Sequence, residues 1–174
     1  AVDRPLASVR RGRTAPDPVS GERLSVVICT CERPVELARC LASLTASISP
    51  PDEIVVVDNA PQGPLARAAV EAVPGVRYVA EPHRGLAIAR NTGIRAARGD
   101  LVAFTDDDTV VHPTWTARVR DAFSDPALLA LTGLVLPAAL DTQAQQVFEH
   151  ELGGFGQGFR TLDFDAEFFR AYRW

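Results

Sequence analysis

The sequence contains no lysine and no methionine, so all 18 of its Lys or Arg residues are arginines. Without lysine, this chain cannot itself form a Walker phosphate loop, a Schiff-base lysine or a Ser-Lys catalytic pair. Any phosphate-binding group in it must therefore be an arginine, a backbone amide or a metal ion. Because even position 1 is not methionine, we expect the chain to be processed or cut from something longer.

Cysteines are few, and no long apolar run is present. The three cysteines, Cys29, Cys31 and Cys40, are odd in number and clustered, which argues against a disulfide framework. We therefore expect free thiols and a cytoplasmic location, which includes the inner face of the membrane. The longest nearly apolar run, residues 128–140, falls short of the roughly 20 residues that span a bilayer, so no transmembrane segment is predicted. A net charge of −4 gives no general attraction to nucleic acid.

The 174 residues are 47% hydrophobic, which suits one domain with a real core. Residues 1–23 are rich in arginine and proline and have little to bury, so they are predicted to be a flexible N-terminal arm. From residue 24 on, apolar strands alternate with helical patterns. Near-continuous apolar strands of this kind predict an α/β fold, a mostly parallel sheet with helices on both faces. The predicted strands are 24–29, 53–58, 76–80, 101–105 and 128–136, and the predicted helices are 34–47, 65–72, 86–97, 113–123 and 142–152.

Polar residues follow three of these strands at the point where each strand ends. They are Thr30 and its neighbours after the first strand, Asp58 after the second, and three consecutive aspartates, 106–108, after the fourth. In parallel sheets, ligands bind at the carboxyl ends of the strands. We therefore expect these side chains to meet at one edge of the sheet.

The aspartates at 106–108 need a specific explanation, because adjacent carboxylates repel one another and a helix cap requires only one. In a strand-like continuation, Asp106 and Asp108 point the same way, and two hard oxygen ligands suit Mg²⁺ or Mn²⁺. A calcium loop starting at Asp106 is excluded, since its sixth and twelfth positions are Val111 and Ala117 rather than Gly and Glu.

Two alternatives remain open at this point. The motif also matches the Asp-x-Asp-x-Thr/Val pattern of haloacid dehalogenase-type phosphatases, although that family uses a lysine that is absent here. Asp58 suits either a turn before Asn59 or a hydrogen bond to a ring N–H of a nucleotide base. A divalent cation bound at Asp106 and Asp108 would hold a diphosphate beside it.

Four segments taken together resemble an inverting family 2 glycosyltransferase of the GT-A fold: residues 24–34, 53–59, 85–94 and 104–108. The resemblance implies a nucleotide-sugar-binding core at 24–136 and a partial acceptor-side region at 137–174. It implies transfer of a sugar, with inversion, from a nucleotide-diphosphate donor, with a UDP-sugar favoured. The acceptor would be a hydroxyl of a glycan, a lipid or a small molecule.

The resemblance also implies roles for individual residues. Asp107 would face the ribose and the sugar, and Asp106 and Asp108 would hold Mn²⁺ or Mg²⁺, with Asp108 as the direct ligand. Arg90 would lie near the diphosphate, unless it only pairs with a nearby carboxylate. The nucleoside pocket would be formed by Thr30, Cys31, Glu32 and the base-binding Asp58.

Two departures from the family pattern matter. Where the family often has Pro-Thr-Tyr-Asn, this chain has Cys29-Thr30-Cys31-Glu32, which removes an aromatic stacking surface for the base. No adjacent Glu-Asp pair follows Asp108, so the base that would take the acceptor's proton is expected beyond Trp174. A donor-binding module or inactive homologue without turnover is therefore the main alternative. Glu149 is the first carboxylate to test as the base, and the others are Glu151, Asp163, Asp165 and Glu167.

Overall fold

The structure, a computed structural model, describes residues 22–154. They belong to two compact units that divide after Leu129. The predicted arm at 1–23 lies outside the described residues except for its last two positions, and so do Asp163, Asp165 and Glu167. Within the described range, no helix is both long enough and apolar enough to cross a membrane.

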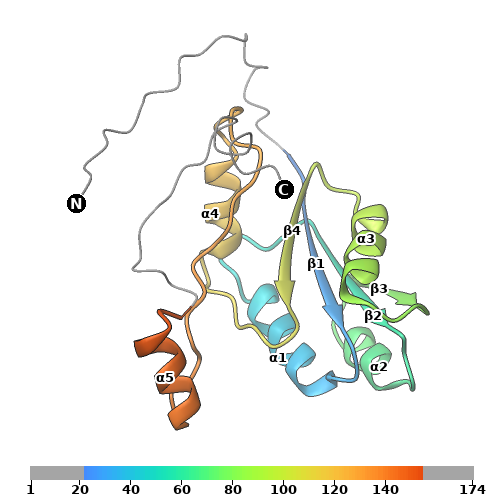
Figure 1. The fold of residues 1–174 in the computed structure, drawn as a ribbon. Helices are drawn as coiled ribbons and strands as arrows, with labels where there is room; N and C mark the ends of the chain where they lie inside the picture. The colour runs from blue at the N-terminus through green and yellow to red at the C-terminus, as the bar shows by residue number, and fades with distance from the viewer. Residues whose placement is uncertain (1–21, 155–174) are drawn as a thin grey trace, which may run out of the picture. The chain divides into compact units, whose positions relative to one another are not determined.

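The first unit contains a four-stranded sheet in the order β3-β2-β1-β4, in which every neighbouring pair is parallel (Figure 1). Valine and isoleucine dominate the two central strands, which are almost completely buried, as expected for strands covered on both faces. The predicted parallel α/β sheet is therefore confirmed. The four strands are β1 (Leu24–Thr30), β2 (Glu53–Asn59), β3 (Val76–Glu81) and β4 (Leu101–Asp106).

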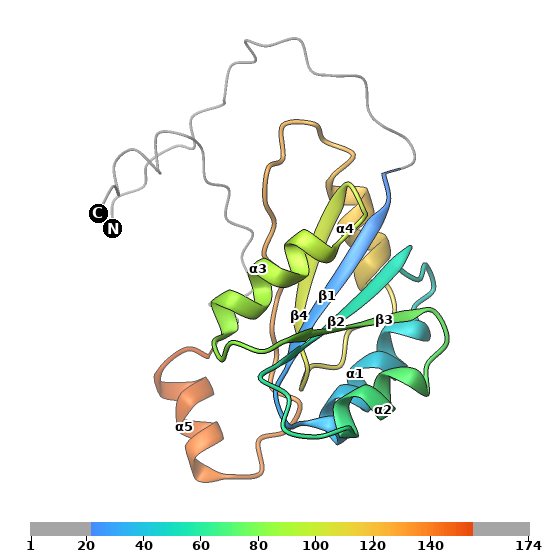
Figure 2. The ribbon, with the colours of Figure 1, turned by 90° about the vertical axis from the view of Figure 1, so that its right-hand side faces the viewer.

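Helices cover both faces of this sheet, as predicted. One face, with Ile28 and Val56, packs in a single core cluster with residues of α1 (Pro34–Thr45), α2 (Leu65–Glu71) and α4 (Trp115–Ala122). The other face, with Val27 and Val57, is covered by α3 (Leu86–Ala96). Figure 2 shows α3 lying across the strands on the side opposite α1 and α2.

Two features hold α3 close to the sheet. A Cβ at Gly93 would collide with Val27 and touch Val57, so only glycine permits this approach. At the start of the helix, the side chain of Asn59 fixes the preceding loop: its Nδ2 donates to the His83 carbonyl at 2.7 Å, and its Oδ1 accepts from the Gly85 N–H at 2.8 Å. The end of β2 therefore sets where α3 begins.

One predicted element is wrong. Residues 128–136 form no strand and run as irregular chain, with several large apolar side chains exposed, including Leu131 and Leu134. The helix predicted at 142–152 is confirmed as α5 (Gln143–Glu151) in the second unit. It begins with a capping box, in which Thr142 and Gln145 satisfy each other's backbone N–H groups.

Candidate functional site

The predicted polar edge is assembled at the carboxyl ends of the strands. Thr30 ends β1 and pairs in register with Asp58 of β2, while Cys29 pairs with Asp106 at the end of β4. Three strands that are far apart in sequence therefore deliver polar groups to one edge. Parallel sheets with helices on both faces bind their ligands at this edge.

The three aspartates do not continue the strand, contrary to the prediction. β4 ends at Asp106, and the chain then turns, with the Thr109 N–H donating to the Asp106 carbonyl at 3.2 Å. The three aspartate side chains nevertheless differ in how far they are buried. Asp107 is buried, whereas the side chains of Asp106 and Asp108 are 71% and 55% exposed.

Asp107 is held inside the edge by two neighbours. The Thr30 hydroxyl donates to its Oδ2 at 2.7 Å, and the Arg33 guanidinium lies 3.5 Å from its Oδ1. Burial raises the pKa of Asp107, while the Thr30 hydrogen bond and the charge of Arg33 oppose that rise. The structure thus brings together two of the predicted residues, Thr30 and Asp107, and adds Arg33, which the sequence did not single out.

Arginines also flank the two exposed aspartates. Arg33 donates to Asp108 at 2.9 Å, and Arg90, on α3, lies 3.5 Å from Asp106. The charges of Asp107 and Asp108 raise the pKa of Arg33, so its charge is secure. Arg90 thus pairs with a carboxylate of the acidic edge, and its predicted role at a diphosphate stays a prediction.

The residues at this edge fit a divalent cation. Asp106 and Asp108 offer exposed carboxylate oxygens, the hard ligands that Mg²⁺ and Mn²⁺ prefer. Within residues 22–154, no group of three or more His, Cys, Asp or Glu side chains is placed to hold a metal ion. A cation here would therefore complete its coordination with ligand oxygens and water, as Mg²⁺ does at nucleotide sites.

Asp58 shows the most unusual environment at the edge. It is 1% exposed, and its Oδ2 accepts a hydrogen bond from the Tyr78 hydroxyl at 2.7 Å. Among the described residues, its Oδ1 is the one buried side-chain acceptor without a hydrogen-bond partner. Burial raises the pKa of Asp58, and the Tyr78 hydrogen bond partly offsets that rise. A buried oxygen of this kind is costly unless a ligand donates to it.

Glu32 and the cysteines lie around the same strand ends. Glu32 adopts a left-handed backbone conformation, with φ 56°, and its carboxylate accepts from the Gln62 N–H at 3.1 Å. Cys31, beside it, is half-buried. Burial raises the pKa of Cys29 to about 11, so this thiol is neutral and a poor metal ligand. All three cysteines are free, as predicted.

The opposite, amino-terminal edge of the sheet is also charged, but its carboxylates are paired within the protein. Glu53 accepts from Ser25 at 2.6 Å and from Arg77 at 2.8 Å. Asp52 accepts from the Leu24 N–H at 2.7 Å and from Arg120 at 2.8 Å. This edge therefore serves the fold, and the carboxyl edge is the candidate site.

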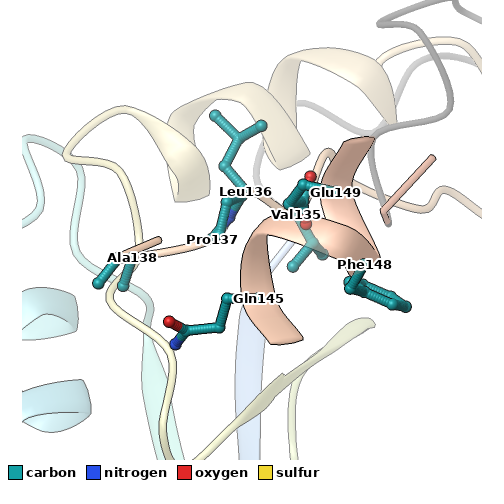
Figure 3. Close-up of a pocket in the computed structure, with 8 residues that line it drawn as sticks. Val135, Leu136, Pro137, Ala138, Gln145, Phe148 and Glu149 are labelled. Atoms are coloured by element: carbon teal, nitrogen blue, oxygen red, sulfur yellow. The ribbon is translucent and has the colours of Figure 1, made fainter. Parts of the chain in front are cut away.

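The second unit contains the candidate base, Glu149. It lies beside a cavity of about 310 Å³ formed between α5 and the chain before it (Figure 3). A Cβ at Gly154 would meet the Glu149 carboxylate, which is the mobile end of that side chain. The cavity is mostly apolar and is lined by Val135, Leu136, Pro137, Ala138, Ala139, Gln145, Phe148 and Glu149.

Comparison with known proteins identifies two relatives named for succinoglycan biosynthesis and for glucuronosyl transfer. The chain is 35% identical over 120 residues to the succinoglycan biosynthesis protein ExoM of Rhizobium meliloti, covering 64% of this chain and 38% of that one. It is 28% identical over 123 residues to a glucosyl-dolichyl phosphate glucuronosyltransferase of Haloferax volcanii, covering 66% and 39%. The chain thus spans less than half the length of these relatives.

Solved structures with the same fold include two manganese complexes. The mannosyltransferase PcManGT of Pyrobaculum calidifontis, in complex with GDP-Man and Mn²⁺, is 28% identical with a TM-score of 0.52, covering 68% of this chain and 36% of that one. Glucosyl-3-phosphoglycerate synthase of Mycobacterium tuberculosis, in complex with Mn²⁺, UDP and glucosyl-3-phosphoglycerate, is 20% identical with a TM-score of 0.53, covering 68% and 47%. These likenesses confirm the GT-A fold. The profile described as "Glycosyl transferase family 2" matches residues 25–167, and the chain belongs to that family.

Proposed function

We propose that this chain carries the donor site of a metal-dependent glycosyltransferase. The enzyme would move a sugar from a nucleotide-diphosphate donor, a UDP-sugar by preference, to an acceptor hydroxyl with inversion. The observation that carries this proposal is the meeting of Thr30, Asp58 and the 106–108 aspartates at the carboxyl edge. Family membership supports the same conclusion and argues against the phosphatase alternative.

Each side chain at the edge has a distinct part in this proposal. Asp58 accepts from the base through its free oxygen, and Asp107, fixed by Thr30, faces the ribose and the sugar. Arg90 would bind the diphosphate oxygens, and its position 3.5 Å from Asp106 supports this role. Asp106 and Asp108 would hold the Mn²⁺ or Mg²⁺, whose positive charge would neutralise the departing diphosphate.

The acceptor side of the reaction needs a carboxylate that takes the proton of the attacking hydroxyl. Glu149 is the candidate within the described residues, and the cavity beside it would receive part of an acceptor. The acceptor itself would be a glycan, a lipid or a small molecule. Because the three cysteines are free, we place the protein in a reducing compartment, the cytoplasm, which includes the inner face of the membrane.

The test separates binding from turnover. Calorimetry would measure the binding of UDP in Mn²⁺ and in EDTA, for the wild type, for Asp108→Asn and for Asp121→Asn. Asp121, an exposed carboxylate on α4 whose side chain lies 3.9 Å from Arg118, serves as the matched control. We expect Mn²⁺-dependent binding in the wild type and in the control, and much weaker binding in Asp108→Asn.

A second assay would then follow UDP release from a panel of UDP-sugars, with and without added hydroxyl acceptors. Turnover supports the enzyme. Binding without any turnover supports the alternative, a donor-binding module or inactive homologue. Absence of Mn²⁺-dependent nucleotide binding would overturn both. Hydrolysis of simple phosphoesters that is lost in Asp106→Asn would instead favour the phosphatase.

A further inference from the structure

The two oxygens of the Asp58 carboxylate have different surroundings. Oδ2 accepts from the Tyr78 hydroxyl at 2.7 Å, whereas Oδ1 has no hydrogen-bond partner, although the whole side chain is buried. A buried carboxylate oxygen without a donor is costly, so its position suits a ligand that supplies one N–H. The carboxylate therefore has one acceptor left for a ligand rather than two.

Tyr78 is itself held in place. Its Cα pairs with that of Val56 in the parallel register, so its side chain is on the same face of the sheet as that of Asp58, two residues further along β2. The Arg67 guanidinium, from α2, lies 4.4 Å from the centre of the Tyr78 ring, in a cation–π contact. Tyr78 also packs against the core cluster that contains residues of α1 and α2. The hydroxyl therefore reaches Oδ2 from a fixed ring.

We propose that Tyr78 is a positioning residue that sets base specificity: by occupying Oδ2, it leaves a single oxygen of Asp58 for the base and so selects uracil. This inference rests on the proposed function, because it assumes that the edge binds a nucleoside diphosphate. The solved relatives leave the base undecided, since one is a complex with UDP and another a complex with GDP-Man. Tyr78 supplies a physical reason for a choice between them.

The selection follows from the hydrogen-bonding edges of the bases. Uracil presents one N–H, at N3, between two carbonyl oxygens, which matches a single free acceptor. Guanine presents two adjacent donors, N1–H and the N2 amino group, which would need both oxygens of a carboxylate. The N3 of cytosine is an acceptor and is repelled by Oδ1. A site that leaves a buried polar group unpaired rejects the wrong ligand strongly.

The free oxygen is buried, so the base reaches it only when the chain around it opens. Nearby, the Gln62 N–H donates to the Glu32 carboxylate at 3.1 Å, which ties the loop after β1 to the loop after β2. The charged and titratable groups that face Asp58 are Tyr78 from β3, Glu32 after β1 and Arg67 from α2.

These groups also predict a pH dependence. Uracil needs the ionised carboxylate, so UDP binding weakens as the pH falls through the pKa of Asp58. Burial raises that pKa, and the Tyr78 hydrogen bond lowers it. Removal of the hydroxyl therefore raises the pKa further, and the midpoint for loss of UDP binding moves to higher pH.

The experiment is calorimetry of the full chain in Mn²⁺ with UDP, CDP and GDP as separate ligands. It compares the wild type with Tyr78→Phe, Asp58→Asn and the double variant, after thermal unfolding has shown that each is folded. We expect the wild type to bind UDP roughly tenfold to a hundredfold more tightly than CDP, and more tightly than GDP. In Tyr78→Phe the preference for UDP over GDP should fall about threefold or more, because both oxygens are then free for the two donors of guanine, and the pH midpoint should be higher. In the Asp58→Asn background, the same substitution should change neither preference.

Each outcome decides a different question. If the wild type binds no nucleoside diphosphate, the proposed function fails. If the wild type binds UDP but Tyr78→Phe keeps its preference over GDP, or weakens all three ligands equally, Tyr78 has only a structural role and this inference alone is wrong. If Tyr78→Phe does not fold, the wild type still decides, because a preference for GDP over UDP contradicts the single-acceptor argument.

Discussion

Substitution of Gly93 by alanine tests how α3 is positioned over the sheet. A Cβ at this position would collide with Val27 and lie 3.4 Å from Val57. Val27 is a short β-branched side chain that is 0% exposed, so it has no room to move aside. Overpacking of a core costs about 1–3 kcal/mol, and here the clash places the cost in the upper part of that range. Alanine returns about 1 kcal/mol of helix propensity, which leaves a net loss of roughly 1–2 kcal/mol.

Urea unfolding followed by tryptophan fluorescence would measure this loss. With a typical slope of about 2 kcal/mol per molar urea, the midpoint should fall by roughly 0.5–1 M. Gly63→Ala is the matched control, because a Cβ there would meet nothing within 4 Å. We expect its stability to stay within about 0.5 kcal/mol of the wild type. If Gly93→Ala is as stable as Gly63→Ala, the close approach of α3 is not a constraint on this fold.

Three further substitutions test the contacts around the site. Thr30→Val removes the 2.7 Å hydrogen bond to Asp107 and should lower the free energy of unfolding by about 1–3 kcal/mol at pH 7. The hydrogen bond stabilises the ionised carboxylate more than the protonated one. Urea unfolding should therefore show a smaller loss of stability as the pH falls through the raised pKa of Asp107. Thr92→Val removes the largest contribution to the pKa of about 2 at Glu81, so NMR titration should show a higher pKa and acid unfolding a midpoint at higher pH. An unchanged titration of Glu81 would contradict this. Arg33→Ala frees Asp108 from an exposed ion pair and removes the charge beside Asp107, so Mn²⁺ should bind about two- to fivefold more tightly without nucleotide. Weaker Mn²⁺ binding would refute the idea that Arg33 competes with the metal.

The sheet was predictable because its strands carry a strong local signal. The segments from Leu24 and from Glu53 are apolar on both faces and end in polar residues, which is the pattern of a strand buried in a parallel sheet. The apolar run at 128–136 carries a similar signal but forms no strand. A short apolar run has no periodicity that distinguishes a strand from other structure. A strand also needs a neighbouring strand to pair with, and the composition of the run does not specify one.

The candidate site was predictable where the strand ends alone define it. Thr30, Asp58 and Asp107 lie at one edge because parallel strands bring their carboxyl ends together. Tyr78 and Arg33 were missed. Tyr78 lies inside a strand rather than at its end, and its reach to Asp58 depends on the register between β2 and β3. The signal that could have found it is a tyrosine hydroxyl in a strand next to a buried carboxylate, which needs a donor.

The turn that the chain makes at the three aspartates was not predicted, because it depends on local hydrogen bonds. A strand-like continuation was predicted because side chains alternate along a strand. The Thr109 hydroxyl instead donates to the Asp106 carbonyl at 2.7 Å and helps to close a turn. Threonine side chains commonly compete with strand hydrogen bonds in this way, so Thr109 was the available signal.

The most direct test of the proposed donor site is whether Mn²⁺ and UDP bind together at the acidic edge. The electron paramagnetic resonance signal of free Mn²⁺ would be titrated with the protein, with and without UDP, for the wild type, Asp106→Asn/Asp108→Asn and Asp121→Asn. We expect UDP to strengthen Mn²⁺ binding by roughly 5- to 150-fold in the wild type and in Asp121→Asn, and we expect the double variant to lose this coupling. If the double variant binds Mn²⁺ and UDP as the wild type does, the aspartates at 106 and 108 do not form the donor site.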